Sequence, residues 1–192
     1  MSSSKLIRLG GLASVLGGLL WILIWYMRLF LDPSDRAVRR LHEGQYEYLI
    51  FIPSILFMAG LAAVHVLQAQ RSRQLGKRGL ILLLVALALM AVGVVVESGI
   101  FAIGILLLII GLIPFGLATL RAQVLPRWSR PLPLITSVVL LASGIISLLF
   151  NPHRDPFIEM FLATLFGIPW ILLGYAVWSQ TDLKIGEHED TP

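Results

Sequence analysis

The stretch that decides the fold runs from Gly79 to Arg121 and begins GLILLLVALALMAVGVVVESGIFAIGILLLIIG. Its first 18 residues carry no charge, and a second apolar run follows the triplet Glu97-Ser98-Gly99. A single helix of this length would measure about 65 Å, whereas the hydrocarbon layer of a bilayer is about 30 Å thick. Two helices that turn at the triplet would each cross the layer once. The stretch therefore predicts a transmembrane helical hairpin.

The composition of the whole chain indicates that lipid surrounds most of it. Of the 192 residues, 57% are hydrophobic and 14% are charged, compared with about 25% charged residues in soluble domains. So short a chain cannot hide that much apolar surface from water in a core of its own. The apolar runs nearly fill its length, which leaves no room for a separate soluble domain.

Six apolar runs predict an all-α integral membrane bundle of six transmembrane helices, arranged as three hairpins. The polar connection between the first two runs has apolar residues on one face, which predicts a short interfacial helix there. The first run is too long for the apolar region of a cleaved signal peptide, so we expect it to remain a span. The expected segments are spans at 9–31, 48–70, 79–97, 99–121, 131–150 and 156–178, and an acidic cytoplasmic tail without fixed structure at 182–192.

The lysine and arginine residues determine the expected orientation. Ten of them lie in the N-terminal segment, the second and fourth connections and the tail, whereas five lie in the other three connections. Cytoplasmic segments are enriched in these residues, so we expect both termini in the cytoplasm of a bacterial inner (plasma) membrane. The main conflict with this orientation is a group of four arginines around the first connection, Arg28, Arg36, Arg39 and Arg40.

Small residues recur within the spans. Gly10, Ser14 and Gly18 are four residues apart, so they predict a smooth helix face on which another helix can pack closely. A Gly-x-Ala segment also ends each even-numbered span, which indicates a helical hairpin repeat in one interpretation and only the abundance of such segments in membrane helices in the other. These segments are 56 and 58 residues apart and begin at Gly60, Gly116 and Gly174.

The sequence lacks the motifs of known membrane enzymes. It contains no cysteine, which excludes disulfides, thiolate metal sites and cysteine nucleophiles. It has no HExxH or GxGD motif, no P-loop and no serine in the context of a rhomboid-like protease. We therefore assign no catalytic, cofactor-binding or metal-binding residue, and an enzyme is the less favoured interpretation.

Five ionisable residues are candidates for a rim or pocket site. Ionisable groups inside spans are costly and are often functional, and His65 is the nearest example, about five residues from the end of the second span. Glu97, His153, Glu159 and Arg28 lie near the expected extracytoplasmic rim, where carboxylates and imidazoles can bind a divalent cation or form acid–base pairs. The alternative is that the rim residues meet water and pair with one another, and that His65 bonds a neighbouring helix or reaches the interface.

The even-numbered spans each contain a proline, at Pro53, Pro114 and Pro169. Proline frees a backbone carbonyl and kinks a helix, sometimes around a cavity. Three kinks on equivalent helices predict a central chamber in one interpretation and only an adjustment of packing in the other.

Three short segments carry a resemblance to known sequences. Leu75-Gly-Lys-Arg-Gly79, Leu117-Ala-Thr-Leu-Arg121 and Leu125-Pro-Arg-Trp128 are similar to segments of uncharacterised bacterial small polytopic membrane proteins. The resemblance covers about the middle half of the chain and implies no activity.

Three functions follow from these observations. The favoured function is an accessory, assembly or lipid-interacting membrane component, with membrane lipids, other membrane protein subunits or a second copy as partners. The alternative is a small transporter or lipophilic-ligand binder with proline-kinked helices around a central cavity, and the third is a membrane enzyme or metal site at the rim. We do not expect nucleic acid as a partner, because the net charge of +4 is spread over helix ends.

Overall fold

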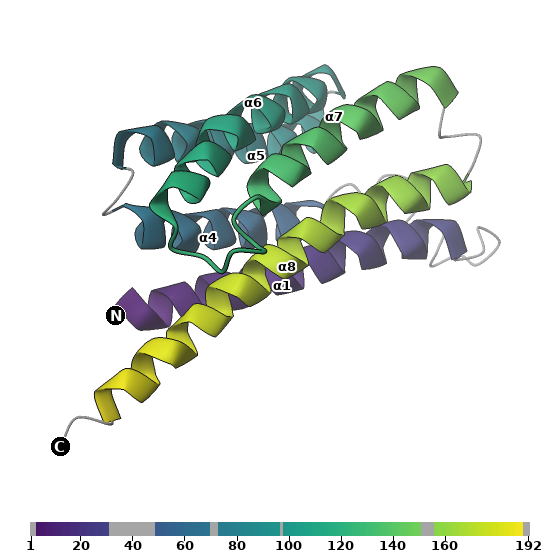
Figure 1. Cartoon of the computed structure of the whole chain (residues 1–192). Helices are drawn as coiled ribbons and strands as arrows, with labels where there is room; N and C mark the ends of the chain where they lie inside the picture. Colours follow the sequence, from purple (N-terminus) through teal and green to yellow (C-terminus); the bar gives the residue numbers. More distant parts are fainter. Residues whose placement is uncertain (1–2, 31–48, 70–72, 97, 151–155, 190–192) are drawn as a thin grey trace.

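The computed structural model describes residues 3–30, 49–69, 73–96, 98–150 and 156–189. Figure 1 shows an elongated helical bundle in which α1 begins and α8 ends at the same end. The all-α prediction is confirmed. The helices of the described residues are α1 (Ser3–Phe30), α4 (Phe51–Gln68), α5 (Arg73–Val96), α6 (Ser98–Ala122), α7 (Leu132–Phe150) and α8 (Pro156–Glu189).

Five of these helices are long and apolar enough to cross a membrane. Their apolar segments are Ser4–Met27, Phe51–Gln68, Gln74–Gly93, Gly99–Ala122 and Met160–Gln180. The described apolar segment of α7 is shorter and runs from Leu132 to Ile146. A chain with several such helices is a polytopic integral membrane protein.

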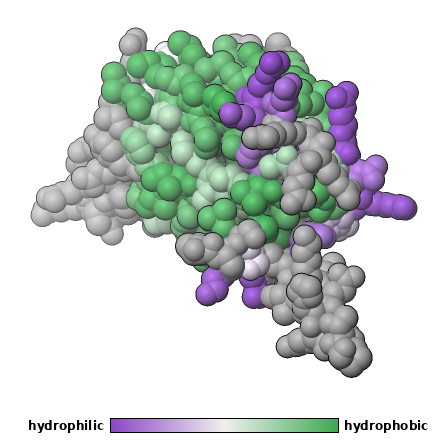
Figure 2. All heavy atoms as spheres, turned by 90° about the vertical axis from the view of Figure 1, so that its left-hand side faces the viewer, coloured by the Kyte–Doolittle hydropathy of each residue, from purple (hydrophilic) through white to green (hydrophobic). Residues whose placement is uncertain are grey.

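The surface of the bundle agrees with a lipid environment. Figure 2 shows apolar residues over much of the visible face. Large apolar side chains on five different helices are at least half exposed, namely Leu23, Ile55, Ile81, Leu106 and Phe161. In water such a surface would drive aggregation, whereas in a bilayer it contacts acyl chains.

The helices form two groups. The terminal group consists of α1, α4 and α8, in which α1 packs along both of the others; the hairpin group consists of α5, α6 and α7. The two groups meet where α4 contacts α5 and where α7 contacts α8. Each helix of an expected hairpin does contact its partner, but α8 packs mainly on α1. The pairing of the first and last helices does not follow from the hairpin pattern of the sequence.

Small residues allow α1 to approach both partners, as the sequence predicts. A Cβ atom added to Gly10 would collide with Ala63 on α4, and one added to Gly18 would lie 2.7 Å from the carbonyl oxygen of Gly167 on α8. Between them, the hydroxyl of Ser14 donates a hydrogen bond of 2.8 Å to a backbone carbonyl of α8. The smooth face of α1 is therefore a packing surface for two helices.

Glycines also allow α5 and α6, the two helices of the predicted hairpin, to pack closely. Helix α5 ends at Val96 and α6 begins at Ser98, in agreement with the expected break between the two helices. Near the turn, Gly93 is in close contact with the backbone of Phe101, and at the other end a Cβ added to Gly79 would lie 2.7 Å from the backbone nitrogen of Phe115. The two helices therefore approach closely at both ends.

The C-terminal segment differs from the expectation. Helix α8 continues to Glu189, so most of the segment 182–192, expected as a tail without fixed structure, is helical. The physical reason is that residues 179–185 contain neither proline nor glycine, and nothing there stops the helix when it leaves the apolar layer. In Figure 1 this end of α8 projects beyond the bundle.

The three glycines of the proposed repeat have different neighbours. Gly60 and Gly174 both approach Ser14 on α1, whereas Gly116 approaches Leu134 on α7. The helix ends that look alike in sequence are thus not packed alike at these positions.

Candidate functional site

Polar side chains are buried where α4, α5 and α6 meet. Gln68 at the end of α4 and Thr119 on α6 are both 0% exposed. Oγ1 of Thr119 lies 3.0 Å from Oε1 of Gln68 and 2.9 Å from the backbone oxygen of Phe115. Buried polar groups are costly in an apolar bundle unless they bond one another, so this contact connects α4 with α6.

His65 and Gly76 complete this group. His65 lies one turn before Gln68 on α4, and its ring is partly exposed although its Nδ1 atom is buried. A Cβ atom added to Gly76 on α5 would lie 3.0 Å from Nε2 of Gln68 and 3.5 Å from Nδ1 of His65. Neither of these two nitrogens has a hydrogen-bond partner among the described residues. We call His65, Gln68, Gly76 and Thr119 the polar cluster.

The polar cluster is only partly visible in the sequence. His65 stands out as an ionisable residue within an apolar run, but the sequence does not show that it lies beside Gln68 and across from Thr119. One signal was available, because residues three apart on a helix share a face, which places His65 and Gln68 together. The contacts with α5 and α6 depend on how the helices pack.

The candidate rim site lies outside the residues that the structure describes. Glu97 and His153 are not described, and Arg28 and Glu159 are described only as backbone positions of α1 and α8. The interfacial helix expected within residues 32–47 lies outside the description as well. The described residues contain no group of three or more histidine, cysteine, aspartate or glutamate residues that could hold a metal ion. The rim site stays a prediction.

The charged side chains that the structure does describe are all basic and lie toward one end of the bundle. They are found where α1 and α5 begin, where α6 ends and in the loop that leads to α7, and Figure 2 looks onto this end. The polar cluster lies on the same side, since it includes the end of α4. These residues are Lys5, Arg8, Lys77, Arg78, Arg121, Arg127 and Arg130.

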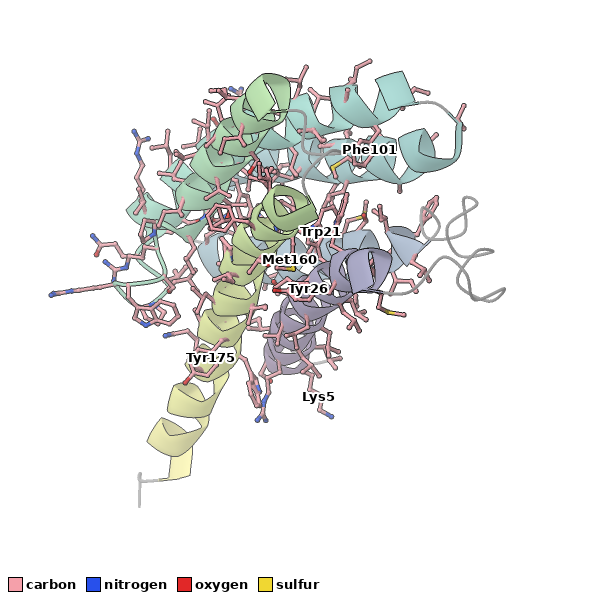
Figure 3. All side chains as sticks on the ribbon, turned by 90° about the vertical axis from the view of Figure 1, so that its right-hand side faces the viewer. Lys5, Trp21, Tyr26, Phe101, Met160 and Tyr175 are labelled. Atoms are coloured by element: carbon pink, nitrogen blue, oxygen red, sulfur yellow. The ribbon has the colours of Figure 1, made fainter. Side chains whose placement is uncertain are left out.

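Two exposed aromatic rings accompany this basic end. Trp128, in the loop before α7, is 50% exposed and its ring centroid lies 6.4 Å from that of Tyr175 on α8. Figure 3 shows Tyr175 on the outer side of α8. Tryptophan and tyrosine are enriched where membranes meet water, so the pair indicates an interfacial position for this end.

Aromatic side chains fill the space between α1, α4 and α8. The rings of Phe57 and Trp170 stack with centroids 4.3 Å apart, and those of Trp21 and Phe166 are 4.8 Å apart. All four side chains are buried, and Figure 3 shows Trp21 turned toward the interior. This part of the terminal group is a packed core, although Pro169 directly precedes Trp170 in it.

Part of α7 carries no buried residue. Near its beginning, the hydroxyl of Ser137 donates to the backbone oxygen of Ile109 on α6 at 3.2 Å. From Val138 to Ile146, by contrast, no residue is buried. We call residues 138–146 the open segment of α7.

The open segment continues the face with which α7 packs. Pro133, Ser137, Leu140 and Gly144 are three or four residues apart and therefore share one side of the helix. The first two are buried, Leu140 is partly buried against the core and Gly144 is exposed. A Cβ atom added to Gly144 would have no neighbour within 4 Å, unlike at the other glycines whose surroundings the structure describes.

Protein-family models, curated proteins and solved structures give no match to this chain. Its function is therefore argued from the polar cluster, the basic end and the open segment of α7.

Proposed function

We propose that this chain is an assembly component of a membrane complex and that its open segment packs against an apolar transmembrane helix of another polypeptide. The observation that carries the proposal is the environment of Gly144. The other glycines whose surroundings the structure describes let a neighbouring helix or side chain approach, whereas Gly144 continues a packing face with no described neighbour opposite it.

Physical chemistry supports an external partner at this position. Glycine in the middle of a helix is less favourable than alanine by about 1 kcal/mol. In membranes, small residues offset this difference where two helices pack closely against each other. Gly144 lies in the interior of α7, and the described part of this chain supplies no neighbour within 4 Å of its Cβ position. A partner helix with small or flat side chains would fill this place.

The proposal also covers how the chain is arranged in the membrane. We propose that α7 forms a sixth span, that both termini are cytoplasmic and that the membrane is a bacterial inner membrane. The apolar character of α7 over Leu132–Ile146 supports the first point. The basic residues gathered at the end where α1 begins support the second. The exposed apolar side chains of the other helices then contact membrane lipids.

The test uses the full chain extracted gently from its own membrane. Native mass spectrometry is expected to show a second polypeptide in fixed ratio to the 21.2 kDa chain. A photo-crosslinking residue at position 144 is expected to attach to that same polypeptide. The substitution Gly144→Leu should remove the partner, because its side chain fills the contact face.

The matched control is Val138→Leu, on the same helix but 65% exposed and away from the packing face. This variant should keep the partner. A chain that extracts as a single copy and gives no protein crosslink from position 144 would refute an assembly role. A crosslink to a second copy of the same chain would name the partner as the protein itself.

A further inference from the structure

The loop between α6 and α7, residues 123–131, is held in one shape by its own hydrogen bonds. Nε of Arg130 donates to the backbone oxygen of Leu125 at 2.8 Å. The backbone oxygen of Pro126 accepts hydrogen bonds from the backbone nitrogens of Ser129 and Arg130, at 3.0 and 3.2 Å. Leu125 and Ser129 are also buried, and Leu125 belongs to the hydrophobic core. The loop is therefore packed onto the bundle, with its backbone fixed between residues 125 and 130.

The start of this loop has an unusual backbone conformation. Gln123 follows Ala122, the last residue of α6, and its φ of 54° makes it the one non-glycine residue with a positive φ in the described part of the chain. Left-handed backbone is unfavourable for a residue with a side chain, and it persists where the surrounding structure imposes it. The backbone nitrogen of Gln123 donates to the backbone oxygen of Thr119 at 3.3 Å. The loop thus begins with a specific turn.

Two neighbouring side chains of this fixed loop are exposed. Arg127 is exposed and has no hydrogen-bond or ion-pair partner among the described residues. Trp128 is 50% exposed, and its ring centroid lies 6.4 Å from that of Tyr175 on α8. A guanidinium, which carries five N–H donors, therefore lies next in the sequence to an aromatic pair of the kind found at membrane interfaces.

The exposed apolar surface of α8 leads to this aromatic pair. Ile168, Leu172 and Tyr175 are three or four residues apart, so they share one side of α8. Their exposed fractions are 43%, 38% and 54%, and in a bilayer this side contacts acyl chains. The surface therefore changes from an apolar stripe to an aromatic pair and then to a cation. A molecule with an apolar tail and an anionic head matches all three parts, whereas an acidic soluble protein matches the cation alone.

The charge of Arg127 is not neutralised within the described part of the chain. The side chains that the structure describes include no carboxylate. Arginine binds phosphate through parallel charge-assisted hydrogen bonds, because its guanidinium group is planar. Lipid headgroups lie at the depth where tryptophan and tyrosine are enriched, so an anionic phospholipid supplies a phosphate at the right level.

We propose that this loop binds an anionic phospholipid, with Arg127 on the headgroup phosphate and with Trp128 and Tyr175 beside the glycerol region. The acyl chains of the lipid lie along the exposed stripe of α8. Because the loop is already fixed, little conformational entropy is lost when the headgroup binds. The proposal does not depend on the partner of α7 and holds for either orientation of the chain in the membrane.

The test uses the full chain purified in detergent. Phosphatidylglycerol and phosphatidylcholine are titrated separately and followed by native mass spectrometry. Phosphatidylcholine should bind more weakly, because its choline group offsets the phosphate charge. Arg127→Gln should weaken binding of phosphatidylglycerol about fivefold, which is the contribution expected of one basic residue near an anionic surface. The matched control Lys5→Gln removes one exposed charge from the start of α1 and should keep the affinity.

Arg127→Gln is the deciding variant because Arg127 is exposed, so the helix content and unfolding of the variant should match those of the parent chain. A loss of phosphatidylglycerol binding in this variant and not in the control supports the proposal. Equal losses in Arg127→Gln and Lys5→Gln would show a general attraction to net charge and would overturn it. Equal binding of the two lipids, unchanged binding in Arg127→Gln, or loss of a bound polypeptide instead of lipid would overturn it as well.

Discussion

The terminal group and the open segment of α7 both carry small residues among apolar ones but are packed differently. In the terminal group, a Cβ atom added to Gly174 on α8 would lie 2.5 Å from the backbone oxygen of Gly11 on α1. The rings of Phe57 and Trp170 stack beside this contact. On α7, no described residue lies within 4 Å of the Cβ position of Gly144. A small residue in a membrane helix therefore does not by itself show which helix packs on it.

This difference assigns roles to the two regions. The terminal group is complete within one chain, because each side of α1 that carries a small residue meets α4 or α8. The open segment is exposed, because among the described residues nothing lies within 4 Å of the Cβ position of Gly144. Changes in the first region should alter stability, and changes in the second should alter assembly.

The largest expected effect comes from the aromatic core of the terminal group. Trp170 is 2% exposed and packs against Phe57, so Trp170→Ala should lower the free energy of unfolding by about 3–5 kcal/mol. Trp128, which is 50% exposed, is the matched control. Trp128→Ala should change the free energy of unfolding by less than about 1 kcal/mol. Denaturant unfolding in mixed micelles, followed by tryptophan fluorescence, measures both. Similar losses in the two variants would contradict the packing of Trp170 in a buried core.

The next effect concerns the close approach of α1 and α8. Gly174→Ala puts a methyl group where the backbones of the two helices meet, so we expect a loss of about 1–3 kcal/mol. The same unfolding measurement applies. If Gly174→Ala left the free energy of unfolding unchanged, the close contact between α1 and α8 would not contribute to stability. The terminal group would then not differ from α7 in this respect.

Much of the fold follows from the sequence because membrane spans are governed by length and polarity. The break between α5, which ends at Val96, and α6, which begins at Ser98, is predictable, since no single helix of that length fits the layer. The contacts of Gly10 and Gly18 follow from their spacing, although the sequence does not name the helices that they meet. The pairing of α1 with α8 could not be predicted, because hydropathy carries no information on which spans are neighbours.

The candidate site was predicted less completely for a related reason. His65 is conspicuous in an apolar run, but its role depends on Gln68, Gly76 and Thr119, which three different helices bring together. A buried amide and a hydroxyl are ordinary residues in a membrane sequence until their distances are known. The rim residues, including Glu97 and Glu159, lie outside the described side chains, so their convergence is still a prediction.

A smaller effect is expected in the polar cluster, which connects the terminal and hairpin groups. Thr119→Val removes the hydroxyl that contacts Gln68 and should cost about 1 kcal/mol, within the range for hydrogen bonds between membrane helices. Gln68→Leu should cost a similar amount. Because the two side chains share one contact, the double variant should lose less than the sum of the single losses. Strict additivity in this double-mutant cycle would show that the two residues do not interact.

The smallest effect has the opposite sign. Gly144→Ala should raise the free energy of unfolding of the isolated chain by up to about 1 kcal/mol, because alanine is the better helix former and its methyl group meets no neighbour. Gly174→Ala lowers the free energy of unfolding, so the same glycine-to-alanine substitution has opposite effects in the two regions. In the extracted complex, however, Gly144→Ala should weaken binding of the partner helix, since the methyl group enters the proposed contact. A variant that stabilises the chain and leaves the complex intact would show that the open segment contacts only lipid.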